Sequence, residues 1–264
     1  MTILVCIPNY GTSNRDYLKR TLSEYASFTH YQLDIHLLLT DEIDVSEFTS
    51  LKITKHFYPK EIGHFLTHTH KQIFTQNIEK FDYFLYIEDD ILLKEVSIDV
   101  FMECSKILPE NMVCGFLRYE FKPNSEYTYL IDCHPEHSVH RGGGRQIIRT
   151  NYKINDIDYL ELHNVHQGCS LLSRNQLLKV IGSGFYFLDH RHGGYAGILE
   201  SAASDIYWRG TIIKVTPRNK INELLIHHLP NKYVNMLPDV YREDIVPDNN
   251  KLKVIENEFN RIVL

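Results

Sequence analysis

The sequence is poor in cysteine and tryptophan, and it has no long uninterrupted run of apolar residues. Its five cysteines form no C-x-x-C pair, so we expect neither a disulfide framework nor a zinc-ribbon site, and we expect a reducing compartment. The apolar N-terminal residues end at Pro8, short of a signal peptide, and no later segment reaches the length of a membrane span. These features predict a soluble, cytoplasmic protein without a transmembrane segment, for which any membrane contact would be peripheral.

An excess of basic residues is also missing. The 264 residues include 28 Lys and Arg against 34 Asp and Glu, a formal net charge of −6, whereas nucleic-acid-binding proteins usually carry a basic face. The chain has neither the G-x-x-x-x-G-K-[ST] phosphate loop nor a G-x-G-x-x-G dinucleotide fingerprint. What is present, 43% hydrophobic and 23% charged residues, is typical of a globular protein with a substantial core and no nucleic-acid partner.

Apolar runs and amphipathic segments alternate over the first 90 residues. The apolar runs predict strands and the segments with helical spacing predict helices, in the order β 2–7, α 17–25, β 33–39, β 51–57, α 62–78 and β 83–87. This order predicts an α/β fold with a mostly parallel sheet and helices on both faces. Ligands of such sheets bind at the carboxyl ends of the strands.

The second half is less regular. It predicts strands over 113–121, 127–133, 167–173 and 211–215, and helices over 174–181, 198–209 and 251–263. No repeat, low-complexity tract or linker interrupts the chain, so we expect one domain over residues 1–264.

Three adjacent carboxylates, Glu88-Asp89-Asp90, directly follow the apolar run 83–87. Mutual repulsion and lost hydration make such a cluster unfavourable unless a cation or many hydrogen-bond donors offset it. Mg²⁺ and Mn²⁺ prefer carboxylate oxygens and share them with substrate phosphates. The alternative is a solvated turn with a helix-capping aspartate, but the position at a strand end favours a metal site.

With this motif and layout, the sequence resembles the glycosyltransferases of the GT-A fold, and Glu88-Asp89-Asp90 has the E-D-D form of their D-x-D motif. The resemblance implies a Rossmann-like, nucleotide-sugar-binding half over 1–95 and an acceptor-binding half over 96–264. It implies a transferase that moves a hexosyl or N-acetylhexosaminyl group from a nucleotide-diphosphate donor, expected to be UDP-linked, to a carbohydrate or glycolipid acceptor. Polysaccharide or glycoconjugate assembly would be its setting.

The resemblance also implies roles for individual residues. Asp90 would be the direct ligand of Mn²⁺ or Mg²⁺, and a late histidine, His227 or His228 with a preference for His228, would be a further ligand. Residues expected to contact the donor are Pro8, Asn9, Tyr10, Asp41, Glu88, Asp89 and Gly168. The segment 63–70 departs from the family, since it lacks the Gly-x-x-x-Ala-x-Asn pattern that many members carry before the acidic strand.

A base for the acceptor hydroxyl is expected in the second half, because that oxygen must lose its proton as it attacks. Glu200 follows the glycine-rich residues 193–197 at the start of a predicted helix, where simple helix capping is the alternative role. Asp205 is the second candidate, but positions five apart on a helix face different ways, so only one of the two is expected in the site.

Two other functions stay open at this point. A nucleotide-sugar-forming nucleotidyltransferase shares the layout and the acidic site, but it usually has a glycine-rich, basic loop after the first strand. Here that loop, 8–13, contains one glycine and no basic residue. A non-catalytic sugar- or nucleotide-binding protein is the other alternative, and only loss of turnover on removal of the base would exclude it.

Overall fold

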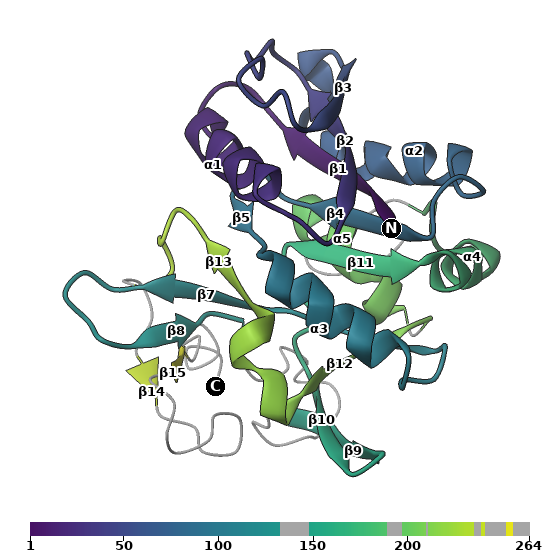
Figure 1. The fold of residues 1–264 in the computed structure, drawn as a ribbon, viewed down its shortest axis with the longest axis vertical. Helices are drawn as coiled ribbons and strands as arrows, with labels where there is room; N and C mark the ends of the chain where they lie inside the picture. The colour runs from purple at the N-terminus through teal and green to yellow at the C-terminus, as the bar shows by residue number, and fades with distance from the viewer. Residues whose placement is uncertain (133–147, 189–196, 210, 235–238, 241–251, 256–264) are drawn as a thin grey trace, which may run out of the picture.

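The computed structural model describes residues 1–132, 148–188, 197–209, 211–234, 239–240 and 252–255. Its first half is built on a five-stranded sheet in the order β11-β4-β1-β2-β3 (Figure 1). The strands are β1 (Thr2–Asn9), β2 (Gln32–Leu39), β3 (Lys52–Phe57), β4 (Tyr83–Ile87) and β11 (Cys169–Ser173). All neighbours are parallel except β11, which runs antiparallel to β4 at the edge. The structure therefore confirms a mixed α/β fold with a mostly parallel first sheet.

Helices cover both faces of this sheet, which explains why β4 and residues 3–8 of β1 form continuous apolar runs. Helix α1 (Arg15–Ala26) buries Leu18, Leu22 and Tyr25 on one side. A 3₁₀ segment, η1 (Lys60–Thr69), and helix α2 (His70–Gln76) lie on the other side (Figure 1). The predicted helix 62–78 is therefore only part α-helix. Gly63, with φ of +53°, interrupts it.

Two further sheets, of four and six strands, hold the other strands of the described chain. One has the order β6-β12-β10-β9, with bounds Met112–Cys114, Ile213–Pro217, Ile157–Leu162 and Ile148–Ile154. The other has the order β14-β15-β8-β7-β13-β5, with bounds Asp239–Val240, Leu252–Ile255, Thr128–Leu130, Leu117–Phe121, Leu225–His228 and Ile91–Leu92. Helix α3 (Glu95–Ser105) packs against β6, α4 (Arg174–Gly182) packs against β11 and β4, and α5 (Ile198–Trp208) packs against β11 and η1. One buried apolar cluster extends from Ile3 in the first sheet to Val215 in β12.

Several predicted boundaries in the second half are wrong. The run 113–121 is split at Gly115 and Phe116 into β6 and β7, which enter different sheets. Within the predicted helix 251–263, residues Leu252–Ile255 form strand β15 instead, because they pair with β8. Helix α3 and the β9–β10 hairpin were not predicted.

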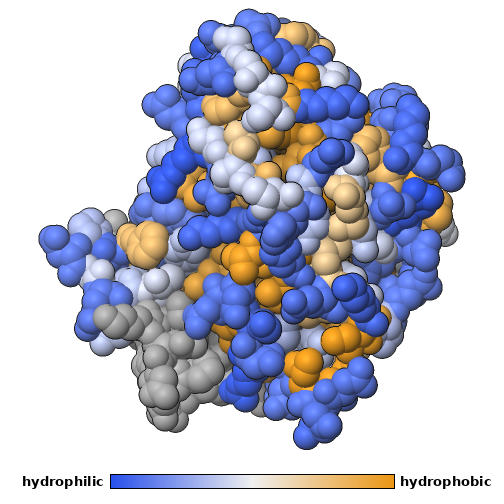
Figure 2. All heavy atoms as spheres, viewed as in Figure 1, coloured by the Kyte–Doolittle hydropathy of each residue, from blue (hydrophilic) through white to orange (hydrophobic). Residues whose placement is uncertain are grey.

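The surface agrees with the composition. Figure 2 shows a mostly hydrophilic face on which apolar side chains are exposed only in separate small areas. Within the described parts of the chain, no helix is both long and apolar enough to cross a bilayer.

His70, at the start of α2, gives the fold a measurable dependence on pH. Its ring is 2% exposed and lies 4.3 Å, centroid to centroid, from the ring of Tyr86. Nδ1 lies 2.6 Å from the carbonyl oxygen of Thr67. Burial, followed by the charge of Lys71, lowers the pKa of His70 well below its ordinary value. The folded protein therefore binds fewer protons here than the unfolded chain does.

We expect His70→Gln to reduce the loss of stability on acidification. As pH falls through about 6.5, His70 becomes protonated in the unfolded chain but stays neutral in the folded protein. The free energy of unfolding therefore falls. Between pH 7.5 and 5.5 this amounts to about 1.3 kcal/mol, since each pH unit below the unfolded pKa costs about 1.36 kcal/mol. Urea unfolding of both proteins at the two pH values measures it. His30→Gln is the control, since Asp99 raises the pKa of exposed His30 and its removal should widen the pH difference.

Candidate functional site

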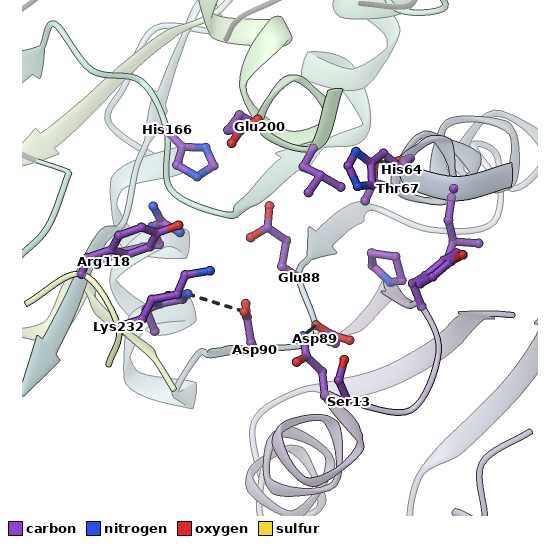
Figure 3. A pocket seen from close by; sticks show the side chains of 18 residues that line it. Ser13, His64, Thr67, Glu88, Asp89, Asp90, Arg118, His166, Glu200 and Lys232 are labelled. Atoms are coloured by element: carbon purple, nitrogen blue, oxygen red, sulfur yellow. Dashed lines mark hydrogen bonds and ion pairs between the residues drawn. The ribbon is translucent and has the colours of Figure 1, made fainter. Parts of the chain in front are cut away.

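A cavity of about 480 Å³ opens at the carboxyl ends of β1 and β4, where β5, β7 and β13 meet the first sheet. Side chains from both halves of the chain line it (Figure 3). Among the residues predicted for the site, those that line it are Pro8, Tyr10, Glu88, Asp89, Asp90, Glu200 and His228. The structure therefore brings the predicted donor loop, acidic motif, base and histidine to one place.

Asp89 is held by the first strand and the first helix. The Nδ2 of Asn9 donates to one carboxylate oxygen at 2.6 Å, and the Nδ2 of Asn14 donates to the other at 2.9 Å. Burial, with the charge of Asp90 next, raises the pKa of Asp89 to about 7, although the two amides oppose the shift. Asn9 thus acts behind the cavity wall, and both oxygens of Asp89 already have protein partners.

Asp90 lies beside His228 because of strand register. Strand β13 pairs with β5 so that His228 stands opposite Ile91, and the backbone N–H of Leu229 donates to the Asp90 carbonyl at 2.9 Å. His228 Nε2 and Asp90 Oδ2 are 3.5 Å apart. Burial would raise the pKa of Asp90, but the hydrogen bond and charge of His228, with more distant cations, outweigh it and lower that pKa.

The other side of His228 contacts Glu120 of β7. Glu120 is fully buried, with Oε1 at 2.5 Å from His228 Nδ1, and Oε2 accepts the backbone N–H of Val234 at 2.6 Å. The ring of Tyr233 stacks on His228 with centroids 5.2 Å apart. Burial lowers the pKa of His228, but the hydrogen bonds to Asp90 and Glu120 outweigh it, so the net shift is upward.

Asp90 and His228 fit a divalent cation. Asp90 Oδ1 is buried and has no hydrogen-bond partner in the described structure, so an oxygen ligand is left for a cation. A carboxylate and an imidazole suit Mn²⁺, and Mg²⁺ accepts a carboxylate together with substrate phosphates. No group of three His, Cys, Asp or Glu side chains in the described ranges could hold a metal ion. A cation here would therefore take its remaining ligands from a bound diphosphate and water.

His227 faces away from this pair. Its ring stacks on Tyr119 with centroids 4.9 Å apart, and its Nε2 lies 3.0 Å from Asn231 Oδ1. Of the two adjacent histidines, only His228 lines the cavity.

Gly168 lies directly behind Glu88, which lines the cavity. The Glu88 N–H donates to the Gly168 carbonyl at 3.0 Å, and Gly168 has φ of +65°. A Cβ on Gly168 would lie 3.0 Å from Glu88 Oε2 and from Ile91 Cγ1. Burial raises the pKa of Glu88 to about 8, against the charge of Arg118. Gly168 thus supports the acidic motif from behind and is not itself a lining residue.

We expect Gly168→Ala to destabilise the fold by more than Gly184→Ala. Both glycines have positive φ, which costs about 1–2 kcal/mol for an ordinary residue. A Cβ on Gly184 meets nothing within 4 Å, whereas the one on Gly168 would crowd Glu88 and Ile91. Chemical denaturation of both variants measures the difference. Equal losses of stability would show that the contact with Glu88 is not tight.

Glu200 stands on the opposite wall, in the first turn of α5 near His166 (Figure 3). His68 fixes this helix end, because its Nε2 lies 2.9 Å from the Ile198 carbonyl and 3.2 Å from Ser201 Oγ. The carboxylate of Glu200 folds over Gly197, where a Cβ would collide with it. The preceding residues 193–196 lie outside the described residues.

Asp205 and Asp41 do not line the cavity. Asp205 is buried on another side of α5, where its Oδ2 lies 3.6 Å from Nη2 of Arg209. It lines a separate small cavity, so of the two candidates for the base only Glu200 lies in the site. Asp41 forms an ion pair with Lys60 at 2.8 Å, and that hydrogen bond lowers its pKa. Neither carboxylate touches the acidic motif.

Several residues of the site were not among those predicted, including Asn14, Glu120, Arg118 and Lys232. Asn14, which bonds Asp89, directly precedes helix α1, and Glu120 lies in β7, where the sequence pattern does not show that it is buried. Arg118 lines the cavity and is held by Asp132 through two bonds of 2.6 and 2.8 Å. Lys232 also lines it, beyond the end of β13, where no periodicity signals its position.

Comparisons with known proteins do not assign a family: no protein-family model matches the sequence, and no curated protein matches it either.

Proposed function

We propose that the protein is a metal-dependent glycosyltransferase of the GT-A type, which transfers a sugar from a UDP-linked donor to a hydroxyl of a carbohydrate or glycolipid acceptor. The observation that carries the proposal is the Asp90–His228 pair at the carboxyl end of β4, with one Asp90 oxygen that has no partner among the described residues. The parallel strands β3, β2, β1 and β4, with the cavity at the carboxyl ends of β1 and β4, support a Rossmann-like donor half.

The donor diphosphate would lie between the acidic motif and the C-terminal wall. A divalent cation held by Asp90 and His228 would neutralise negative charge on the departing diphosphate. Lys232, an exposed cation that lines the same wall, would bind a phosphate oxygen from the other side. Pro8 and Tyr10, at the end of β1, would contact the nucleoside, with the half-exposed ring of Tyr10 available to stack on the base.

Glu200 would act as the base of an inverting transfer. The acceptor oxygen forms a bond to the anomeric carbon while the bond from that carbon to the diphosphate oxygen breaks. The hydroxyl proton goes to the Glu200 carboxylate, and the electron pair of the broken bond leaves with the diphosphate. Glu200 suits this role because it faces the cavity from the wall opposite Asp90 (Figure 3).

A thermal-shift screen of nucleotide sugars with and without Mn²⁺ tests the proposal. A ligand that binds only the folded state raises the melting temperature by mass action. We expect UDP-sugars to raise it in the presence of Mn²⁺ and to lose most of the effect with EDTA. Product formation with the best donor and a panel of sugar acceptors then tests transfer. No shift with any nucleotide sugar would overturn the proposal.

A further inference from the structure

The strand order places His228 between two carboxylates. Strand β13 lies between β7 and β5, and its parallel register with β7 pairs Ile226 with Arg118 and His227 with Tyr119. Continuing that register puts His228 beside Glu120, on the side away from Asp90. The Glu120 Oε1 atom lies 2.5 Å from Nδ1 of His228, so this carboxylate is the hydrogen-bond partner of that ring nitrogen.

We propose that Glu120 is a positioning residue for the cation site, because it holds the Nδ1 proton of His228 and so leaves Nε2 as the nitrogen that can bind a cation placed beside Asp90. This inference rests on the proposed cation site. A neutral imidazole carries its proton on one ring nitrogen, and the nitrogen that donates a hydrogen bond leaves the other as the ligand. Glu120 and Asp90 can both only accept when ionised, but Glu120 Oε1 lies 2.5 Å from Nδ1 whereas Asp90 Oδ2 lies 3.5 Å from Nε2. The shorter bond therefore favours the tautomer that has Nδ1–H.

Both carboxylate oxygens of Glu120 have fixed partners. Its second oxygen accepts the N–H of Val234 at 2.6 Å, and its side chain is fully buried. The same bond anchors the turn that carries Lys232 and Tyr233, both of which line the cavity. Glu120 therefore fixes both the orientation of the imidazole and the position of the wall beside it.

Glu120→Gln separates the effect on the His228 tautomer from the effect on the position of the wall. If the amide oxygen keeps the bond from Val234, the amide NH₂ faces Nδ1, so the imidazole must accept there and carry its proton on Nε2. Turning the amide round would set the NH₂ against the Val234 N–H, two donors that cannot bond. The variant therefore keeps the shape of the site but removes the Nε2 lone pair.

The tautomer of His228 is read directly by ¹⁵N NMR of protein labelled at histidine, at a pH where the ring is neutral, with His228→Asn used to assign its signals. We expect Nδ1–H in the native protein and Nε2–H in Glu120→Gln. This readout needs neither metal nor turnover. Native protein with Nε2–H, or an unchanged tautomer in the variant, would overturn the inference, and the native spectrum alone decides if the variant does not fold.

Mn²⁺ affinity gives the second readout, measured by electron paramagnetic resonance with UDP present. We expect Glu120→Gln to bind Mn²⁺ about 10–100-fold more weakly, the usual effect of an outer partner of a ligand. The control is Glu161→Gln, since Glu161 accepts the Tyr152 hydroxyl at 2.7 Å on β10 and does not line the cavity. Equal affinities in the two variants would contradict the role of Glu120. Failure of the proposed function would instead show as native protein that binds no nucleotide sugar.

Discussion

Asp90→Ala is expected to weaken Mn²⁺-dependent binding of UDP by more than about 100-fold, since loss of even an outer partner of a metal ligand costs about 10–100-fold. The fold should survive, because removing this carboxylate relieves a charge that raises the pKa of both Glu88 and Asp89. Titration calorimetry with UDP at fixed Mn²⁺ measures the affinity, and thermal unfolding checks the fold.

Asp82→Ala is the matched control for this experiment. Asp82 precedes the same strand at its other end, where its exposed carboxylate lies 2.9 Å from Nη2 of Arg174. Removing it should leave UDP affinity as it is in the native protein. If Asp90→Ala bound UDP with Mn²⁺ as tightly as Asp82→Ala does, Asp90 would not be a metal ligand.

Glu200→Gln is expected to lower turnover by about 10²–10⁴-fold, the usual contribution of a general base, with little change in donor affinity. The amide keeps the size of the side chain and most of its hydrogen bonding, so only basicity is lost. The measurement is kcat at saturating donor and acceptor, with UDP affinity determined separately. Unchanged kcat would leave Glu200 as a helix-capping residue and would favour a retaining mechanism without an enzyme base.

Asp205→Asn in the same helix is the companion variant. Because Asp205 is paired with Arg209 away from the cavity, we expect loss of stability, about 3 kcal/mol for a broken buried ion pair, without a comparable fall in kcat. A collapse of kcat in this variant alone would transfer the role of base to Asp205. Loss of turnover with donor binding retained in Glu200→Gln would also distinguish an enzyme from a sugar-binding protein.

The sequence predicted secondary structure best where all residues of a run are buried in the same apolar surroundings. Strand β4 was predicted over its full extent, 83–87, because apolar side chains fill both of its faces, and the acidic motif at its end stood out against that run. The edge strand β5 was missed, since two residues, Ile91 and Leu92, carry no periodicity.

The contacts that complete the site depend on pairing between distant strands. Glu120 and His228 are 108 positions apart, and their contact follows from the register of β13 with β7. Nothing in the local pattern shows that Glu120 is buried. Asp205 illustrates the opposite error, since an acid near a predicted site was assigned a role that its orientation on α5 does not support.

We propose that Asp90 and His228 together hold a divalent cation that binds a nucleotide diphosphate. Anomalous diffraction at the manganese edge, from crystals grown with Mn²⁺ and UDP, tests it most directly. The expected result is one manganese peak within coordination distance of an Asp90 oxygen, His228 Nε2 and oxygens of the UDP diphosphate. A diphosphate bound in the cavity with no manganese between these two side chains would contradict it.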